Sequence, residues 1–302
     1  MPPRTVAVEL NACLYARYDL LGWRTPLLLG GLELEARMPR EPEAAEWARV
    51  EEGDVPYLRE PEGCDAALRH PSSFWGVSGS RLHGVQIDGI LVDGLDQLPP
   101  HVDRDFVLDH VAMWSGRFIG WLNAGAGAIV AERRGGRGLS RGEASSDVVT
   151  AMDPRKRRLR TDFIASAVAT PALAQHAATM TNASIEVPVP WAIWDDAEHS
   201  VESDPRRAVI DACTAAEAGI ESRLPRMSGV RGIVNKAKAY NQRFRSRSLR
   251  IGRIRDQLAA PRNQAAHSGR EMMRTQSQQA LEVAREVLQI VNPGQALAGS
   301  RT

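Results

Sequence analysis

The sequence predicts an α+β protein: a mixed α/β domain over residues 1–200, an all-α helical bundle over residues 205–292 and a flexible tail over residues 293–302. Three observations support this prediction. The 302 residues exceed what a single hydrophobic core usually supports, so two domains are expected. Strand-like runs occur in the first domain alone. Beyond Asp204 the apolar patterns have helical spacing, which indicates a bundle.

The N-terminal domain combines strands with helices. Three runs bounded by Gly, Pro or charged turn residues predict strands: Thr5–Leu10, Leu27–Ala36 and Val85–Val92. A helix is expected over Phe106–Leu122, where apolar residues recur at spacings of three and four. A second helix is expected to begin near Asp162 and to bend or split at Pro171, because proline removes a backbone hydrogen-bond donor.

The domain boundary is expected near residues 195–204. A predicted strand at Ser184–Val189 leads into this passage, which is rich in proline, tryptophan and acidic residues. Asp204 and Pro205 then suit the N-cap and the first position of a helix. The helix carries one apolar stripe, formed by Val209, Cys213, Ala216, Ile220 and Leu224. Further helices are expected over Val230–Phe244, Leu249–Ala260 and about Thr275–Val291.

The C-terminal domain contains a strongly basic segment. Between Arg223 and Thr275 there are 14 Lys and Arg residues against two acidic ones, although the whole chain has a net charge of only +1. This asymmetry suggests an anionic partner, with nucleic acid the leading candidate. Five arginines are expected to contact RNA: Arg243, Arg245, Arg247, Arg250 and Arg253. The alternative is a solvated helical surface in an arginine-rich protein.

Several classes of protein have no support in the sequence. No apolar run is long enough for a membrane-spanning helix, and the N-terminus lacks the apolar region of a signal peptide. The three cysteines lie far apart and form no Cys-x-x-Cys pair, so neither a disulfide framework nor a cysteine zinc site is expected. We therefore expect a cytoplasmic protein without membrane contact. The motifs of P-loop NTPases, zinc proteases and Ser hydrolases are absent.

No metal site and no cofactor are predicted. The one cluster that could bind a metal consists of Asp195, Asp196, Glu198 and His199. Adjacent acidic residues in a hinge more often face water, so we do not assign them this role.

The segment that decides the functional prediction is Pro261–Gly269. In it Arg262 and Asn263 are followed, after three residues, by His267 and a small polar turn, with a long helix beyond. The pattern Arg-Asn-x-x-x-His is expected by chance roughly 0.02 times in a chain of this composition. A looser pattern, Arg followed by His at a similar spacing, also fits Arg104 and His110, but we interpret His110 as a structural residue on an apolar helix face.

This segment resembles the catalytic signature of the HEPN family (higher eukaryotes and prokaryotes nucleotide-binding domains). The resemblance covers roughly residues 205–292 and includes an early helix with an internal acid, Glu217. It implies that Arg262, Asn263 and His267 are catalytic residues of an endoribonuclease. It also implies a homodimer through the C-terminal bundle, which brings two Arg-His sets into one cleft.

The chemistry of these residue types suits RNA cleavage without a metal. Histidine titrates near neutral pH, so it can accept the proton of a ribose 2′-hydroxyl or donate one to the leaving 5′-oxygen. Arginine offers a fixed charge to the transition state. On a regular helix Asn263 and His267 share a face, whereas Arg262 and His267 differ by about 140°. The structural alternative is that Arg262 pairs with an acid and His267 caps a helix end.

The leading hypothesis is a HEPN-type endoribonuclease, a toxin or phage-defence effector whose residues 1–200 act as a sensor or regulatory domain. Its partners would be RNA, a second copy of the chain and an antitoxin or regulatory protein. The alternative is a non-catalytic HEPN module that binds RNA, a nucleotide or a protein and drives oligomerisation. A third hypothesis places the chemistry in residues 1–200, where no motif names a reaction.

Overall fold

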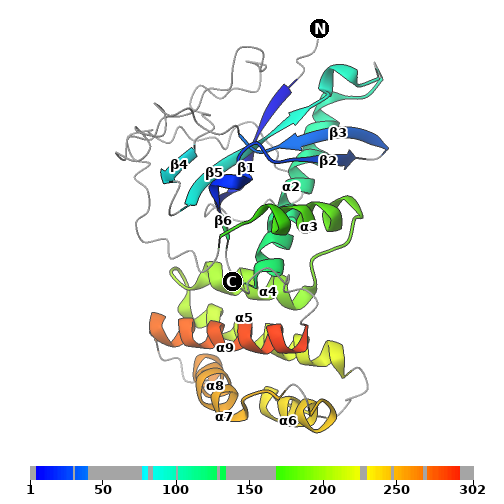
Figure 1. Cartoon of the computed structure of the whole chain (residues 1–302). Coiled ribbons are helices and arrows are strands. Elements are labelled where there is room, and N and C mark those ends of the chain that lie inside the picture. Colours follow the sequence, from blue (N-terminus) through cyan, green and yellow to red (C-terminus); the bar gives the residue numbers. More distant parts are fainter. Residues whose placement is uncertain are drawn as a thin grey trace. The chain divides into compact units, whose positions relative to one another are not determined.

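The computed structural model describes ten ranges of the chain, residues 5–29, 31–39, 77–80, 84–99, 101–127, 130–133, 168–224, 230–245, 248–267 and 271–292. The chain divides into two compact units (Figure 1). The first comprises Met1–Leu122 and Ile129–Glu186, and the second comprises Asn123–Ala128 and Val187–Thr302. In the described part of the chain, no helix is both long and apolar enough to cross a membrane. The expected tail over residues 293–302 lies outside the described residues.

The first unit contains an antiparallel sheet, which has six strands among the described residues. They are β1 (Thr5–Ala16), β2 (Arg24–Leu29), β3 (Leu32–Arg37), β4 (Val77–Ser80), β5 (Gly84–Asp93) and β6 (Ala131–Arg133). Their order is β2-β3-β5-β1-β6, and β4 pairs with β5. The strands predicted at Thr5–Leu10 and Val85–Val92 are confirmed as parts of β1 and β5.

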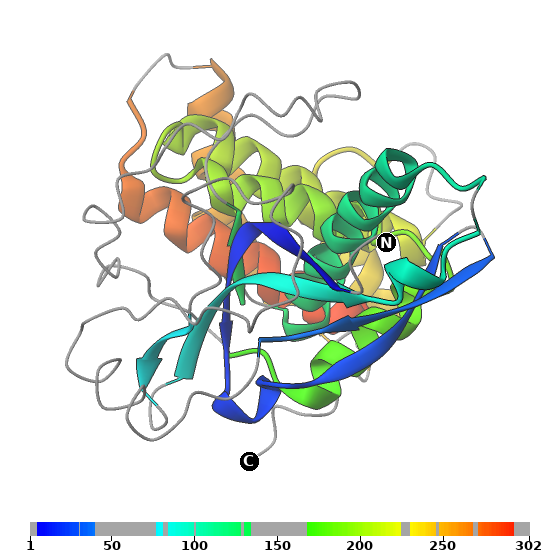
Figure 2. The same ribbon diagram turned by 90° about the horizontal axis from the view of Figure 1, so that it is seen from above.

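The run Leu27–Ala36 is a hairpin, so the prediction of one strand there is wrong. Leu29 pairs with Leu32, and the chain reverses between them. Gly31 in this turn has φ +93°, a left-handed conformation that glycine adopts without strain. Alternate residues of both strands are buried, as expected for strands with one face on a core. Figure 2 shows β2 and β3 lying side by side.

Two long helices accompany the sheet, α2 (Arg104–Ala126) and α3 (Pro171–Asn182), together with the short 3-10 turns η1 (Tyr18–Leu20) and η3 (Leu95–Gln97). The predicted helix at Phe106–Leu122 is confirmed by α2. Within the first unit, Asn182 ties three elements together: it accepts from Trp114 Nε1 on α2 at 2.8 Å and donates to the Pro26 carbonyl on β2 at 2.7 Å. Pro171 begins α3 after an N-cap at Thr170, and the start predicted near Asp162 lies outside the described residues.

The second unit is helical in its described residues. Its elements are α4 (Val189–Ser200), α5 (Pro205–Arg223), α6 (Ile233–Arg243), α7 (Ile251–Ile254), the π-helical turn η5 (Arg255–Ala259), α8 (Ala260–His267) and α9 (Arg274–Val291). Figure 1 shows α5 between α4 and the α6–α8 group, with α9 alongside it. Together the two units make the chain a mixed α+β protein.

Helix α4 occupies the passage where the sequence places a strand and a boundary. Ser184–Val189 forms no strand, and the units divide between Glu186 and Val187 rather than near residues 195–204. Pro188 is the N-cap of α4 and Pro190 lies in its first turn, where proline costs no hydrogen bond. The α4 tryptophans, Trp191 and Trp194, are buried, and Trp194 Nε1 donates to the Leu281 carbonyl on α9 at 3.1 Å.

The core of the second unit lies between α5 and its neighbours. Asp204 caps α5 as predicted, because its side chain accepts from the Arg207 amide at 3.0 Å. The whole predicted stripe from Val209 to Leu224 is buried. Gly219 packs closely against α9: a Cβ atom there would lie 2.5 Å from a methyl carbon of Leu288, so the Leu288 side chain would have to shift.

Candidate active site on the C-terminal helices

The candidate catalytic residues lie on a helical run that contains a π turn. The run begins with α7 at Ile251, widens through η5 and ends with α8 at His267. Pro261 is buried in it, and in a regular α-helix its ring would clash with the carbonyl four residues earlier. The π turn directly before α8 is the distortion that accommodates this proline. Such turns occur often at functional sites because they change the direction in which side chains point.

All three predicted catalytic residues are exposed on α8. Arg262 donates to Asn263 Oδ1 at 3.4 Å, so these two side chains meet. His267 occupies the last turn of the helix, four residues after Asn263 and therefore on the same face. Among the described residues, no hydrogen bond joins His267 to Arg262 or Asn263, and no carboxylate forms an ion pair with Arg262.

Helix α5 supports the end of α8. Arg206 Nε donates to the Ala265 carbonyl at 2.7 Å, satisfying one of the carbonyl groups that the last turn of a helix leaves without a partner. Further along α5, Cys213 is buried and its pKa is raised to about 12, mainly by burial and then by the Glu217 charge. The Arg262 and Lys236 charges oppose this shift, so Arg262 lies in the electrostatic neighbourhood of α5.

Glu217, the acid expected inside the early helix, binds a lysine. Lys236 Nζ on α6 lies 3.1 Å from a Glu217 oxygen and 2.6 Å from a Glu221 oxygen. Burial alone would lower the pKa of the Lys236 ammonium, but its hydrogen bonds to Glu221 and Glu217 raise the pKa above its usual value. This ion-pair group therefore links α6 to α5.

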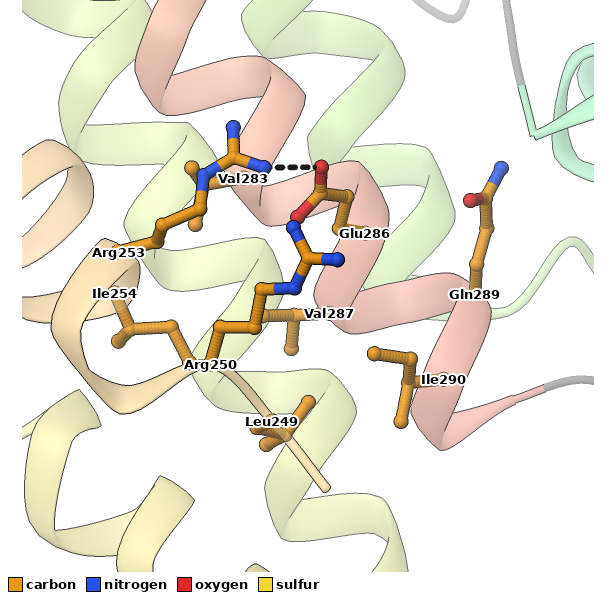
Figure 3. Close-up of a pocket in the computed structure, with 9 residues that line it drawn as sticks. All are labelled: Leu249, Arg250, Arg253, Ile254, Val283, Glu286, Val287, Gln289 and Ile290. Atoms are coloured by element: carbon orange, nitrogen blue, oxygen red, sulfur yellow. Dashed lines mark hydrogen bonds and ion pairs between the residues drawn. The ribbon is translucent and has the colours of Figure 1, made fainter. Parts of the chain in front are cut away.

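The five arginines predicted to contact RNA have different surroundings. Arg253 donates to Glu286 Oε1 at 2.5 Å, so its charge is compensated (Figure 3). Arg243 lies over the Phe244 ring at 5.8 Å. Arg245 and Arg250 are exposed, and Arg247 lies outside the described residues.

The free positive charge of the basic segment is smaller than its sequence suggests, because acids from other elements neutralise part of it. Arg274, for example, forms an ion pair with Glu202. Apart from Arg223, whose guanidinium donates to the Val291 carbonyl and to Asn292 Oδ1, six basic side chains of the segment are exposed and, within the described residues, form no ion pair with a carboxylate: Arg231, Lys238, Arg243, Arg245, Arg250 and Arg262. We call these six residues the exposed cation set. They lie on or beside α6, α7 and α8.

A buried polar cluster on α4 was not expected from the sequence. Asp195 is only 3% exposed and accepts from the Asn123 side chain at 2.8 Å, whereas an adjacent acid in a hinge would face water. Burial raises the pKa of Glu198, and the charges of His199 and Arg285 partly oppose this effect. In the described residues no group of three or more His, Cys, Asp or Glu side chains could hold a metal ion.

Two other features have local explanations. His110 Nδ1 lies 2.7 Å from the Phe106 carbonyl, and its ring packs on the Phe106 ring at 4.0 Å, so this histidine interacts within its own helix. The stripe from Val209 to Leu224 is covered by other helices of the same unit. The stripe is therefore not available as a surface for a partner chain.

The fold and the site define an α+β protein whose helical unit presents an exposed Arg-Asn-His set and exposed cations. No protein-family model, curated protein or solved structure matches this chain.

Proposed function

We propose that the second unit is a metal-independent endoribonuclease of HEPN type, with Arg262, Asn263 and His267 as its catalytic residues. The observation that carries this proposal is their exposure on α8: among the described residues, Arg262 has no carboxylate partner that would explain it as a structural residue. The exposed cation set extends from this site and would attract a polyanion. The proposal also includes a biological role: the chain acts as a toxin or phage-defence effector, and its first unit acts as the sensor.

The proposed reaction needs proton transfers and charge stabilisation. The ribose 2′-oxygen attacks the adjacent phosphorus, its proton goes to a base, and the bond from phosphorus to the 5′-oxygen breaks as that oxygen receives a proton. His267 is the acid-base residue, because an exposed imidazole can reach a bound strand. Arg262 stabilises the charge on the phosphoryl oxygens, and Asn263 accepts a hydrogen bond from the Arg262 side chain.

One histidine per site cannot easily act as acid and base in the same step. The proposal therefore includes a homodimer in which two copies of α8 face a shared cleft, so that two His267 residues divide the proton transfers. Within each chain, Arg206 holds the end of α8 on α5 through its hydrogen bond to the Ala265 carbonyl.

The substrate chemistry tests the proposal. Purified full-length chain in excess EDTA is incubated with a single-stranded RNA, its 2′-O-methyl counterpart and the DNA of the same sequence. We expect cleavage of the RNA alone, with products that end in a 2′,3′-cyclic phosphate and begin with a 5′-hydroxyl. Binding of RNA without cleavage would favour the non-catalytic binding module, and cleavage of DNA or of 2′-O-methyl RNA would exclude attack by the 2′-oxygen.

A further inference from the structure

The second unit contains a pocket at the start of the helical run that ends with the candidate active site. It has a volume of about 360 Å³ and is formed between the start of the α7–α8 run and the last turns of α9 (Figure 3). Its apolar lining includes Leu249, Ile254, Val287 and Ile290, and Arg250, Arg253 and Glu286 add charged groups. The volume is at the lower end of the range for small-molecule sites, so it suits one compact ligand rather than a chain of units.

The two arginines of the pocket differ in how they are held. Arg253 donates to Glu286 at 2.5 Å and lies 3.8 Å from Glu282, so its guanidinium plane is fixed and its charge is compensated. Arg250 is exposed and forms no ion pair with any carboxylate among the described residues. Arg253 can therefore serve as a flat stacking surface, whereas Arg250 keeps a charge for an anion.

We propose that this pocket binds a single unpaired nucleotide. A planar base would stack on the Arg253 guanidinium and on the apolar lining, because bases stack on arginine planes as they do on aromatic rings. Its phosphate would bind Arg250, whose planar donor group matches phosphate oxygens. A planar apolar body joined to a phosphate is the combination that distinguishes nucleotides from simple anions.

The source of the nucleotide is the RNA strand in the proposed function, and to that extent the inference rests on it. Arg250 is the N-cap of the helical run that carries Arg262 twelve residues later, a distance of about 18 Å along a helix, so a bound strand of several nucleotides could occupy the pocket and the candidate active site together. The pocket would then select which nucleotide is unpaired a few nucleotides from the cleaved bond. A free mononucleotide has the same chemistry and is the other source.

Binding measurements separate these sources from a simple anion site. Full-length protein is titrated with adenosine monophosphate, adenosine, inorganic phosphate and an uncleavable 2′-O-methyl RNA decamer. We expect Arg250→Ala to weaken the binding of the mononucleotide or the decamer about ten- to a hundredfold, the effect of losing one charge-assisted hydrogen bond. Arg253→Lys keeps the charge but removes the plane, so it should weaken nucleotide binding and leave phosphate binding unchanged.

The matched control is Arg255→Ala, because Arg255 is exposed on the same run, pairs with Asp256 and lies outside the pocket. Its binding should equal that of the wild type. If Arg250→Ala weakens the binding of the decamer alone, the pocket binds the RNA strand. If it weakens the binding of the mononucleotide, the pocket binds a free nucleotide. Equal binding by wild type and Arg250→Ala, phosphate binding as tight as that of the mononucleotide, or no binding of either probe would overturn the proposal.

A cleavage assay with ordinary RNA on the same samples keeps the two proposals apart. Nucleotide binding that depends on Arg250, in a protein that never cleaves RNA, would reject the endoribonuclease and keep the pocket. Cleavage that is unaffected by Arg250→Ala, together with unchanged binding, would reject the pocket and keep the endoribonuclease.

Discussion

At the scale of single residues, the surroundings of Arg262 favour a functional role for this residue over a structural one. A structural arginine would pair with an acid, as Arg207 pairs with Asp211 and Arg274 with Glu202. Among the described residues the Arg262 side chain forms a hydrogen bond to the Asn263 amide and no ion pair with a carboxylate. An exposed guanidinium held by a neutral neighbour retains its charge for a phosphate group.

Replacement of Arg262 tests this interpretation. We expect Arg262→Ala to lower the rate of RNA cleavage by about 10²- to 10³-fold, the usual effect of removing a group that stabilises the transition state. Arg262→Lys should restore part of the rate, because it keeps the charge without the planar donors. Single-turnover rates with a radiolabelled RNA provide the measurement, and thermal unfolding confirms that both variants fold. Equal rates in wild type and Arg262→Ala would contradict the assignment.

The buried cluster of α4 predicts a dependence of stability on pH. Burial raises the pKa of Glu198, so the folded state holds this proton at pH values where the unfolded state has released it. Through this group, the free energy of unfolding should increase as the pH falls from 7 through the raised pKa. This gain in stability should level off below about pH 4.3, the pKa of a glutamate in the unfolded chain. Above the raised pKa the ionised group reduces stability.

Glu198→Gln should remove this effect. Relative to wild type, the variant should be stabilised at pH 7 by on the order of 1 kcal/mol, and the difference should shrink by pH 4.5. Urea unfolding at the two pH values measures the free energies. Asp196→Asn, an exposed neighbour on the same helix, serves as the control. If the difference in unfolding free energy between Glu198→Gln and wild type stays constant with pH, it would contradict the conclusion that burial raises the pKa of Glu198.

At the scale of elements, the α6–α8 group carries most of the exposed cation set. If about five of these cations contact phosphates of single-stranded RNA, the logarithm of affinity should fall with the logarithm of salt concentration with a slope of roughly −3.5. Reversal of Lys238, Arg243 and Arg245 to Glu should flatten that slope. Fluorescence anisotropy over a salt series measures it.

The control for this experiment reverses a paired residue instead. Arg207 on α5 is exposed but forms an ion pair with Asp211 in its own helix, 3.2 Å away. Its reversal should leave the slope unchanged. If the triple variant binds RNA with the affinity and slope of the wild type, RNA binds elsewhere or not at all.

The elements also show what the sequence could and could not predict. Helix α5 was predictable because Asp204 and Pro205 mark its start and a regular apolar stripe marks its buried face. Helix α4 was not predictable, because its prolines and acidic residues are typical of a linker. Its two tryptophans indicate a packed helix only once their burial is known. The two strands within Leu27–Ala36 are separated by a Gly-Gly signal that a run of apolar residues obscures.

The candidate site was predictable in its residue types but not in its geometry. The order of Arg262, Asn263 and His267 in the sequence indicates the chemistry. Their exposure, however, could not be derived from the sequence. The π turn before Pro261 depends on how the helix relieves one steric clash. The partners of Arg253 and Lys236 come from segments distant in sequence, so the count of charges between Arg223 and Thr275 overstates the available positive charge.

At the scale of the whole molecule, the proposal requires two copies of the chain. The apolar stripe of α5 is buried within one chain, so the dimer must form through other surfaces of the helical unit. Light scattering at micromolar concentration should give about twice the mass of one chain. A monomer at every concentration, with and without RNA, would contradict a site shared between two copies.

The central claim is that His267 transfers protons during RNA cleavage, and its replacement tests this most directly. His267→Ala should lower the cleavage rate in EDTA by about 10²- to 10⁴-fold, the usual contribution of general acid-base catalysis, while RNA binding is retained. His110→Ala is the matched control, because His110 interacts within α2, and it should cleave at the wild-type rate. Cleavage by His267→Ala at the wild-type rate would contradict the account.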